Sequence, residues 1–301
     1  MNRFSKVSSV LLLACSLTIS ATSVSIADPV QPTVNYTFEG NNNDSGNGST
    51  FTPAVACPAD PCNTTTNFGT EGDDGFLEWS SSDERGGGFV IDTEQSLTNT
   101  YTILMKFSFA DFSGYRKIID YLDRSSDTGF YIFNSRINFY PLGTSANSFT
   151  AGQPMTLMVT RQATTGTEGV FTVYSYNGST FNQELQVTDT NGTSIPSASS
   201  VHVGGTKLGF FFDDLSTSSE ATTSGKVFSV KMWSGAALTS AELETVATAP
   251  ASGEVQENVE TPEIPLANTG GTINLGILFA GVGLVGFGAW LLTRRKGLAQ
   301  K

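Results

Sequence analysis

Two acidic stretches of the sequence carry the oxygen-rich side chains that a hard cation prefers. The first stretch offers Glu39, Asn43 and Asp44, and the second offers Asp213, Asp214 and Glu220. Calcium binds several oxygens from carboxylates and carbonyls, and loops rich in Asp and Asn supply them. The two stretches therefore predict calcium as a cofactor, with ordinary polar turns in an acidic chain as the alternative.

Aromatic residues provide a second kind of binding chemistry. Flat rings stack on sugar rings, while fixed polar groups orient the sugar hydroxyls. We expect Trp79, Tyr115 and Tyr140 to form such a platform, whereas Trp233 lies in an apolar strand and is assigned to the core. The sequence does not name the ligand.

Nucleophilic catalysis finds little support in the chain. His202 is the single histidine, and no nucleophile motif accompanies it. It alternates with Val201 and Val203, which predicts a strand with an outward imidazole. Asp127 follows Ser125 and Ser126 and is expected in a turn before a strand.

The cysteines point to an oxidising compartment. Cys57 and Cys62 bracket four residues and predict a small disulfide loop that shapes a local turn. A second Cys or His pair, as a zinc site requires, does not follow. The third cysteine, Cys15, lies near the N-terminus.

Short β-prone runs separated by Gly, Asn, Asp and Ser must position these residues. Such runs predict an all-β sandwich or barrel. They span residues 34–38, 88–91, 102–109, 117–122, 129–133, 136–140, 155–160, 169–176, 207–212 and 226–233. One helix is predicted at the end of this domain, with Thr239 and Glu242 as a capping box and with Leu238, Leu243 and Val246 facing the sandwich.

The N-terminus predicts export. Residues 1–27 have a basic start, an apolar stretch and small residues before Asp28, as in a signal peptide. The alternative is a lipobox that ends at Cys15. The two terminal segments, 1–27 and 270–301, hold six of the 16 basic residues and none of the 28 acidic ones, so the chain between them has ten basic residues and a net charge of −18. Such a charge argues against nucleic acid as a partner.

The C-terminus has three parts in order. Residues 248–265 form an acidic, Pro-containing linker. An uncharged apolar run at 273–292 has the length of a transmembrane helix. The basic cluster Arg294, Arg295 and Lys296 then predicts a cytoplasmic C-terminus.

This tail, residues 266–301, resembles the cell-wall sorting signal of sortase substrates. Leu266-Ala267-Asn268-Thr269-Gly270 is similar to the LPxTG pentapeptide, with Ala267 where the common form has Pro. The resemblance implies sortase as a partner, cleavage between Thr269 and Gly270, and covalent attachment of Thr269 to peptidoglycan. The alternatives are a plain membrane anchor and the Pro-Glu-Pro tail of exosortase substrates, from which Ile264 departs.

The region 28–247 resembles bacterial laminin-G-like, concanavalin A-like lectin/glucanase domains. The opening Tyr36-Thr37-Phe38-Glu39-Gly40-Asn41 and the closing Ala237-Leu238-Thr239 with Glu242 carry the resemblance. It implies a jelly-roll sandwich of two antiparallel sheets, one of them concave, in which the two acidic stretches approach each other. The hydrolases of this fold carry an E-x-D-x-x-E strand, which is missing here, so the expected protein is not an enzyme.

Together these features predict a secreted, cell-wall-anchored, lectin-like protein that binds a glycan or a surface protein. Two alternatives stay open. One is a structural surface protein without a glycan ligand, and the other is a surface glycoside hydrolase with an unrecognised carboxylate pair.

Overall fold

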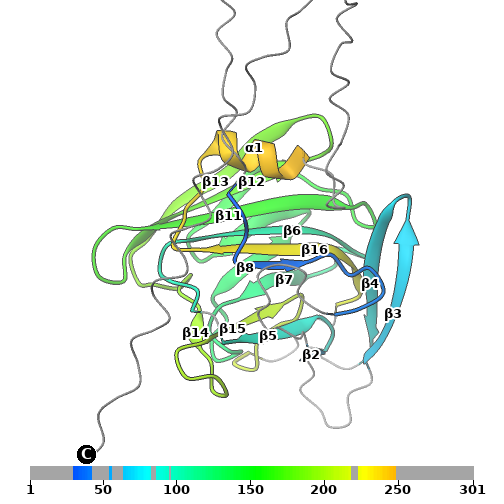
Figure 1. Ribbon diagram of the computed structural model, residues 1–301, viewed down its shortest axis with the longest axis horizontal. Coiled ribbons are helices and arrows are strands. Elements are labelled where there is room, and N and C mark those ends of the chain that lie inside the picture. The colour runs from blue at the N-terminus through cyan, green and yellow to red at the C-terminus, as the bar shows by residue number, and fades with distance from the viewer. Residues whose placement is uncertain are drawn as a thin grey trace, which may run out of the picture. The chain divides into compact units, whose positions relative to one another are not determined.

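The computed structural model describes residues 30–42, 54–55, 64–82, 86–94, 96–217 and 223–248, with 54–55 described as backbone only. In these ranges the chain is mostly β-structure, with two antiparallel sheets and one short helix (Figure 1). None of the helical residues in the ranges forms a helix long and apolar enough to cross a membrane. The predicted signal peptide, Cys57, Cys62, the linker, residues 266–270 and the apolar run 273–292 lie outside the described residues.

The first sheet contains the longest strands and the last strand of the domain. Its order is β13 (Phe181–Asp189), β12 (Gly169–Tyr176), β11 (Met155–Ala163), β6 (Tyr101–Phe109), β16 (Gly225–Ser234), β4 (Asp74–Ser81) and β3 (Thr64–Glu71). The short β1 (Val34–Tyr36) also pairs with β16. Strand β16 therefore lies inside the sheet, hydrogen-bonded to β6, β4 and β1.

The second sheet is built from shorter strands. Its order is β10 (Gly143–Ser148), β9 (Arg136–Tyr140), β8 (Gly129–Phe133), β7 (Tyr115–Asp120), β15 (Thr206–Phe210), β5 (Phe89–Thr93) and β2 (Ala54–Val55). In addition, β14 (Ser197–Ala198) pairs with β15. Strands β7, β8 and β9 are consecutive in the chain and form an antiparallel meander.

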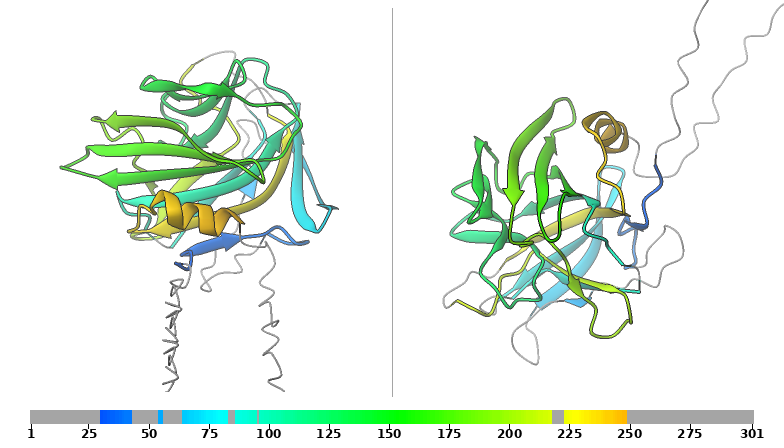
Figure 2. Two further views of the ribbon diagram at one scale, coloured as in Figure 1. Left: turned by 90° about the horizontal axis from the view of Figure 1, so that it is seen from above. Right: turned by 90° about the vertical axis from the view of Figure 1, so that its left-hand side faces the viewer.

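The core lies between the two sheets, which face each other as a sandwich (Figure 2). Alternate residues of each strand point inward, as in Ile103, Met105 and Phe107 of β6 and in Phe130 and Ile132 of β8. Since side chains alternate across a strand, their neighbours point to the outer faces. The outer faces of the two sheets therefore carry the residues that remain for ligands.

The helix α1 (Ser240–Thr248) confirms the prediction made from its capping box. The backbone N–H of Thr239 donates to Glu242 Oε2 at 2.8 Å, and the backbone N–H of Glu242 donates to Thr239 Oγ1 at 3.4 Å. The helix packs on the outer face of the first sheet (Figure 2). There the buried Leu238, Leu243 and Val246 join Leu104, Met158 and Trp233 in a second apolar cluster.

All ten predicted strand regions overlap observed strands. The sequence analysis missed the hairpin of β3 and β4, the small polar strand β10, the polar edge strand β13, and the two-residue strands β2 and β14. The strand predicted around His202 is wrong: residues 201–204 form a turn, in which the backbone N–H of His202 donates to Ser199 Oγ at 2.7 Å.

Candidate functional site

Two of the three predicted platform residues meet on the outer face of the second sheet. Tyr115, Asp127, Tyr131 and Tyr140 line a cavity of about 120 Å³, which we call the tyrosine hollow. The meander of β7, β8 and β9 sets this arrangement, with Lys117 opposite Tyr131 and Gly129 opposite Tyr140. Because Phe130 and Ile132 point into the core, Tyr131 between them faces outward.

The two tyrosines at the rim are exposed, and one of them is packed against a neighbouring ring. Tyr115 is 39% exposed, and its ring stacks on Phe133 with centroids 3.9 Å apart and planes within 6°. Tyr140 is 41% exposed and ends β9. A ring that is already packed on one face loses little freedom when a ligand covers the other. The hollow thus offers two exposed aromatic surfaces, and Phe133 holds that of Tyr115 in place.

Tyr131 and Asp127 form the floor and one wall. Tyr131 is buried, and its hydroxyl donates to the backbone carbonyl of Asp127 at 2.7 Å. The same hydroxyl lies 3.5 Å from Asp127 Oδ1 and 3.5 Å from Asp213 Oδ1. These contacts tie the turn that carries Asp127 to the sheet, so a carboxylate stands at a defined place beside the two exposed rings.

A buried charge cluster lies beneath the hollow. The fully buried ammonium of Lys117 is 3.3 Å from Asp214 Oδ2 and 3.6 Å from Asp213 Oδ1, and it donates to the carbonyl of Ser126 at 3.2 Å. It also lies 5.0 Å from the ring centroid of Tyr131. Buried charges are tolerated when they are paired in this way. The cluster therefore lies against Tyr131, which forms the floor of the hollow.

The electrostatics of Asp214 follow from this cluster. Burial by itself raises the pKa of a carboxyl, since it disfavours the charged form. Lys117 and the backbone N–H groups of Ser216 and Thr217 outweigh the burial, so the pKa of Asp214 lies below its ordinary value. Asp214 is therefore ionised, and Lys117 is the cation that it faces.

This pairing bears on the predicted calcium site. Asp213 and Asp214 are buried and already compensated by a protein ammonium, and a second cation beside Lys117 would be repelled, so the two carboxylates do not fit calcium by themselves. Glu39 is exposed and packs near Gly75 in the first sheet, while Asn43, Asp44 and Glu220 lie outside the described residues. Across the described ranges, no three His, Cys, Asp or Glu side chains come together as a metal site.

The third predicted platform residue, Trp79, is a correction. It is buried in the core, where its ring stacks on Phe211 at 4.9 Å and its indole N–H donates to Thr223 Oγ1 at 3.1 Å. Its ring is therefore not available to a ligand. Trp233 is buried as expected, and its indole N–H donates to the carbonyl of Val30 at 2.7 Å.

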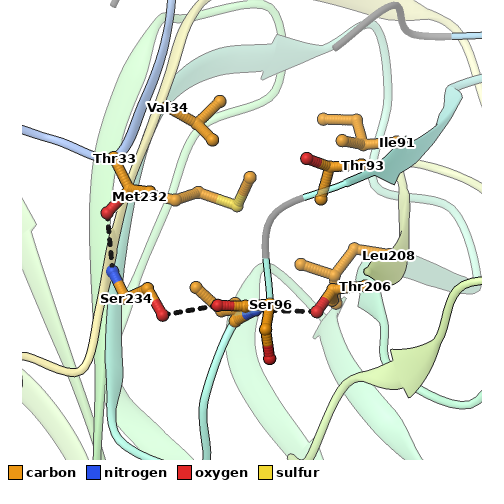
Figure 3. Close-up of a pocket in the computed structure, with 10 residues that line it drawn as sticks. Thr33, Val34, Ile91, Thr93, Ser96, Thr206, Leu208, Met232 and Ser234 are labelled. Carbon is orange, nitrogen blue, oxygen red and sulfur yellow. Dashed lines mark hydrogen bonds between the residues drawn. The ribbon is translucent and has the colours of Figure 1, made fainter. Parts of the chain in front are cut away.

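A cavity near one end of the core is too small to be a site. It measures about 10 Å³, roughly the space of one water molecule, and Figure 3 shows that apolar side chains such as Val34, Ile91 and Leu208 surround it. Hydrogen bonds along its edge join Ser234 to Thr33 and to Ser96 (Figure 3). These bonds tie the segment before β6 to the first sheet, so the feature is structural.

Sequence reasoning missed three members of the site, namely Lys117, Asp127 as a wall residue, and Tyr131. The alternation within 129–133 could have placed Tyr131 on the outer face, because Phe130 and Ile132 are the apolar pair. The partners of Lys117 could not be found in this way, since Asp213 and Asp214 are distant in the chain and come near only through the fold.

Comparisons with known proteins agree with the architecture. No protein-family model matches the sequence, and no curated protein matches it. Among solved structures, the chain is similar to domain 4 of AbnA, a GH43 extracellular arabinanase from Geobacillus stearothermophilus, in complex with arabinotriose. The TM-score is 0.53 at 12% sequence identity, over 72% of this chain and 98% of that chain.

Two further structures show a weaker likeness. One is of botulinum neurotoxin type C, whose cell entry depends on interaction with two ganglioside molecules, with a TM-score of 0.42, 11% identity, and coverage of 72% of this chain and 50% of that chain. The other is the exoplasmic/lumenal domain of VIP36 in its Ca²⁺/Man3GlcNAc-bound form, with a TM-score of 0.31, 10% identity, and coverage of 60% and 86%. At such identities the likeness concerns the fold alone.

Proposed function

We propose that this protein is a non-catalytic, concanavalin A-like lectin that binds a glycan in the tyrosine hollow. The observation that carries the proposal is the pair of exposed rings of Tyr115 and Tyr140 beside the carboxylate of Asp127. Sugar rings present C–H faces that stack on aromatic rings, and their hydroxyls donate to carboxylates. The arabinotriose complex of a domain with a similar fold is consistent with a sugar ligand.

The size of the hollow limits the ligand. At about 120 Å³ it is smaller than the range of about 300–1,000 Å³ that is typical of pockets for drug-sized ligands. We therefore expect it to hold one or two sugar residues of a longer chain, with the remainder of the glycan in solvent. Binding of this kind is weak at one site and gains strength when many copies are displayed on one surface.

A glycan array followed by calorimetric titration tests the proposal. Removing a stacked ring costs about 1–2 kcal/mol, so we expect Tyr115→Ala and Tyr140→Ala each to weaken binding by roughly 5- to 30-fold. Phe68→Ala is a matched control, because Phe68 is also an exposed aromatic, at 42%, but lies in β3 of the other sheet. Failure to bind any glycan would favour the structural alternative, and release of reducing sugar would favour a hydrolase.

The place of action is a separate part of the proposal. The sequence of tail elements at 266–301 supports export, cleavage after Thr269 and covalent attachment to peptidoglycan by a sortase. Mass spectrometry of the C-terminus in cells tests it. A chain that ends at Thr269 with a wall fragment attached is the expected product, whereas a chain that still ends at Lys301 would leave only a membrane anchor.

A further inference from the structure

A second open groove lies on the opposite sheet, beside α1. It has a volume of about 380 Å³ and adjoins a hollow of about 460 Å³, with which it shares Pro154, Thr156, Tyr176 and Asn177. We call the two together the helix groove. Leu104, Val246 and Ala247 form an apolar edge where α1 meets the sheet. The tyrosine hollow contains none of these residues, so the two sites are separate.

The floor of the helix groove is a row of polar residues in register. Ser229 of β16 lies opposite Lys106 of β6, Lys106 opposite Thr156 of β11, and Thr156 opposite Tyr176 of β12. All four line the groove, so the strand pairing sets their spacing at about 5 Å from one to the next. Beyond this row, the adjoining hollow adds the polar side chains Asn147, Gln153, Asn182 and Glu184.

Lys231 is the exceptional residue of this groove. The structure describes five lysines, and four of them form ion pairs: Lys106 with Asp74, Lys117 with Asp213 and Asp214, Lys207 with Asp123, and Lys226 with Glu71. Lys231 makes no ion pair and no hydrogen bond through its ammonium within the described residues, although the domain is acidic. It lines the groove two residues along β16 from Ser229, on the same face.

The burial of Lys231 makes this lack of a partner costly. Burial lowers the pKa of its ammonium, because the charged form loses hydration and gains no compensating partner. An anion in the groove would stabilise the charged ammonium and so compensate for the hydration that it loses on burial. The neighbouring Lys106 is already paired with Asp74, so Lys231 is the cation that is available to pair with an anionic ligand.

We propose that the helix groove binds an oligosaccharide that carries a carboxylate, with Lys231 as its anchor. The carboxylate of a uronic or sialic acid accepts a charge-assisted hydrogen bond from Lys231, and the adjacent sugar stacks near Tyr176. The amide and hydroxyl side chains along the row hydrogen-bond to sugar hydroxyls. A purely acidic peptide would use the lysine but not this row of sugar-type partners.

Titration of the purified full-length protein with tetragalacturonate tests the proposal, with sialyllactose as a second carboxylated sugar and pentaglutamate as a peptide. We expect Lys231→Met to weaken tetragalacturonate binding at least about tenfold, as the loss of one charge-assisted hydrogen bond implies. The methyl ester of tetragalacturonate should bind the wild-type protein as weakly as the acid binds the Lys231→Met variant. Lys226→Met, on the same strand but already paired with Glu71, should leave the affinity unchanged.

Further measurements separate the outcomes. Methionine replaces the half-buried ammonium with an apolar group, so Lys231→Met should unfold at the same temperature as the wild type or higher, which excludes loss of fold as the cause. NMR shifts on titration should map to Thr156 and Tyr176. Four results would each overturn the proposal. Two concern affinity: the acid and its methyl ester bind equally well, or neither acidic sugar binds. The other two are Lys231-dependent binding of pentaglutamate that is tighter than that of the sugars, and NMR shifts confined to Tyr115 and Tyr140. A negative result in these experiments would not count against glycan binding in the tyrosine hollow, because that proposal is tested with other variants, Tyr115→Ala and Tyr140→Ala.

Discussion

Removal of the buried ammonium of Lys117 tests the account of the cluster beneath the tyrosine hollow. In Lys117→Met, two buried carboxylates that lay 3.3 and 3.6 Å from the ammonium would lose their cation. Breaking a buried ion pair by removing one partner costs about 3–5 kcal/mol, because the remaining charge stays buried without compensation. We therefore expect the free energy of unfolding to fall by about that amount.

Urea unfolding of the full-length protein, followed by the fluorescence of the buried Trp79 and Trp233, measures the loss. The triple variant Lys117→Met, Asp213→Asn, Asp214→Asn is the control. Asn side chains keep an oxygen that accepts the backbone N–H bonds now made to Asp213 and Asp214. The triple variant should therefore be more stable than Lys117→Met alone.

The pH dependence gives a second readout of the same reasoning. Since the pKa of Asp214 is lowered in the folded wild type, its stabilising contribution is complete above the unfolded value of about 4 and is lost as the pH falls through the folded value. In Lys117→Met, burial without the ammonium raises the pKa of the carboxyls, so the folded variant takes up protons as the pH falls. The difference in stability should shrink between about pH 7 and pH 4. A cost below about 1 kcal/mol, or a difference that grows on acidification, would refute this account.

Two other substitutions test the core and the helix cap. Trp79→Ala should lower the free energy of unfolding by about 3–5 kcal/mol, because it leaves a cavity beside Phe211. The control Phe68→Ala should change the free energy of unfolding by less than about 0.5 kcal/mol. Equal effects of the two variants in urea unfolding would contradict the assignment of Trp79 to the core. Thr239→Ala should lower the free energy of unfolding by about 1 kcal/mol through loss of the helix cap. Thr245→Ala, inside the same helix, should lower it by less or should stabilise the protein. Thermal unfolding of the two variants tests this difference.

Periodicity was sufficient to predict the class of fold and most strands. Regions such as 102–109 and 155–160 are rich in β-prone residues and became β6 and β11. Strand β13 was missed because it lies at the sheet edge and carries polar residues on its exposed side, as in Gln183 and Gln186. Strand β10 was missed because it is built from small polar residues.

The error at Trp79 has a physical explanation. Leu77 and Trp79 stand two apart and share one face of β4, whereas Glu78 and Ser80 lie on the other face. That alternation indicates a buried tryptophan, and it was available in the sequence. Once β4 is recognised as a strand, the indole belongs to the core.

The candidate site could be predicted only in part. Tyr115 and Tyr140 were selected by residue type, but they come together because β7 and β9 flank β8, which is a matter of strand order. The pairing of Lys117 with Asp213 and Asp214 joins distant parts of the chain. Likewise, Lys231 becomes unusual only when the partners of the other lysines are known.

The position of β16 has a consequence for how the domain is made. It is the last strand in the chain, yet it lies between β6 and β4 and also holds β1. Until residues 225–234 leave the ribosome, β6 and β4 have no common neighbour, and the first sheet remains two separate pieces. Contacts between the two ends of a chain close late in folding. The native domain therefore cannot form before synthesis of its last strand is complete.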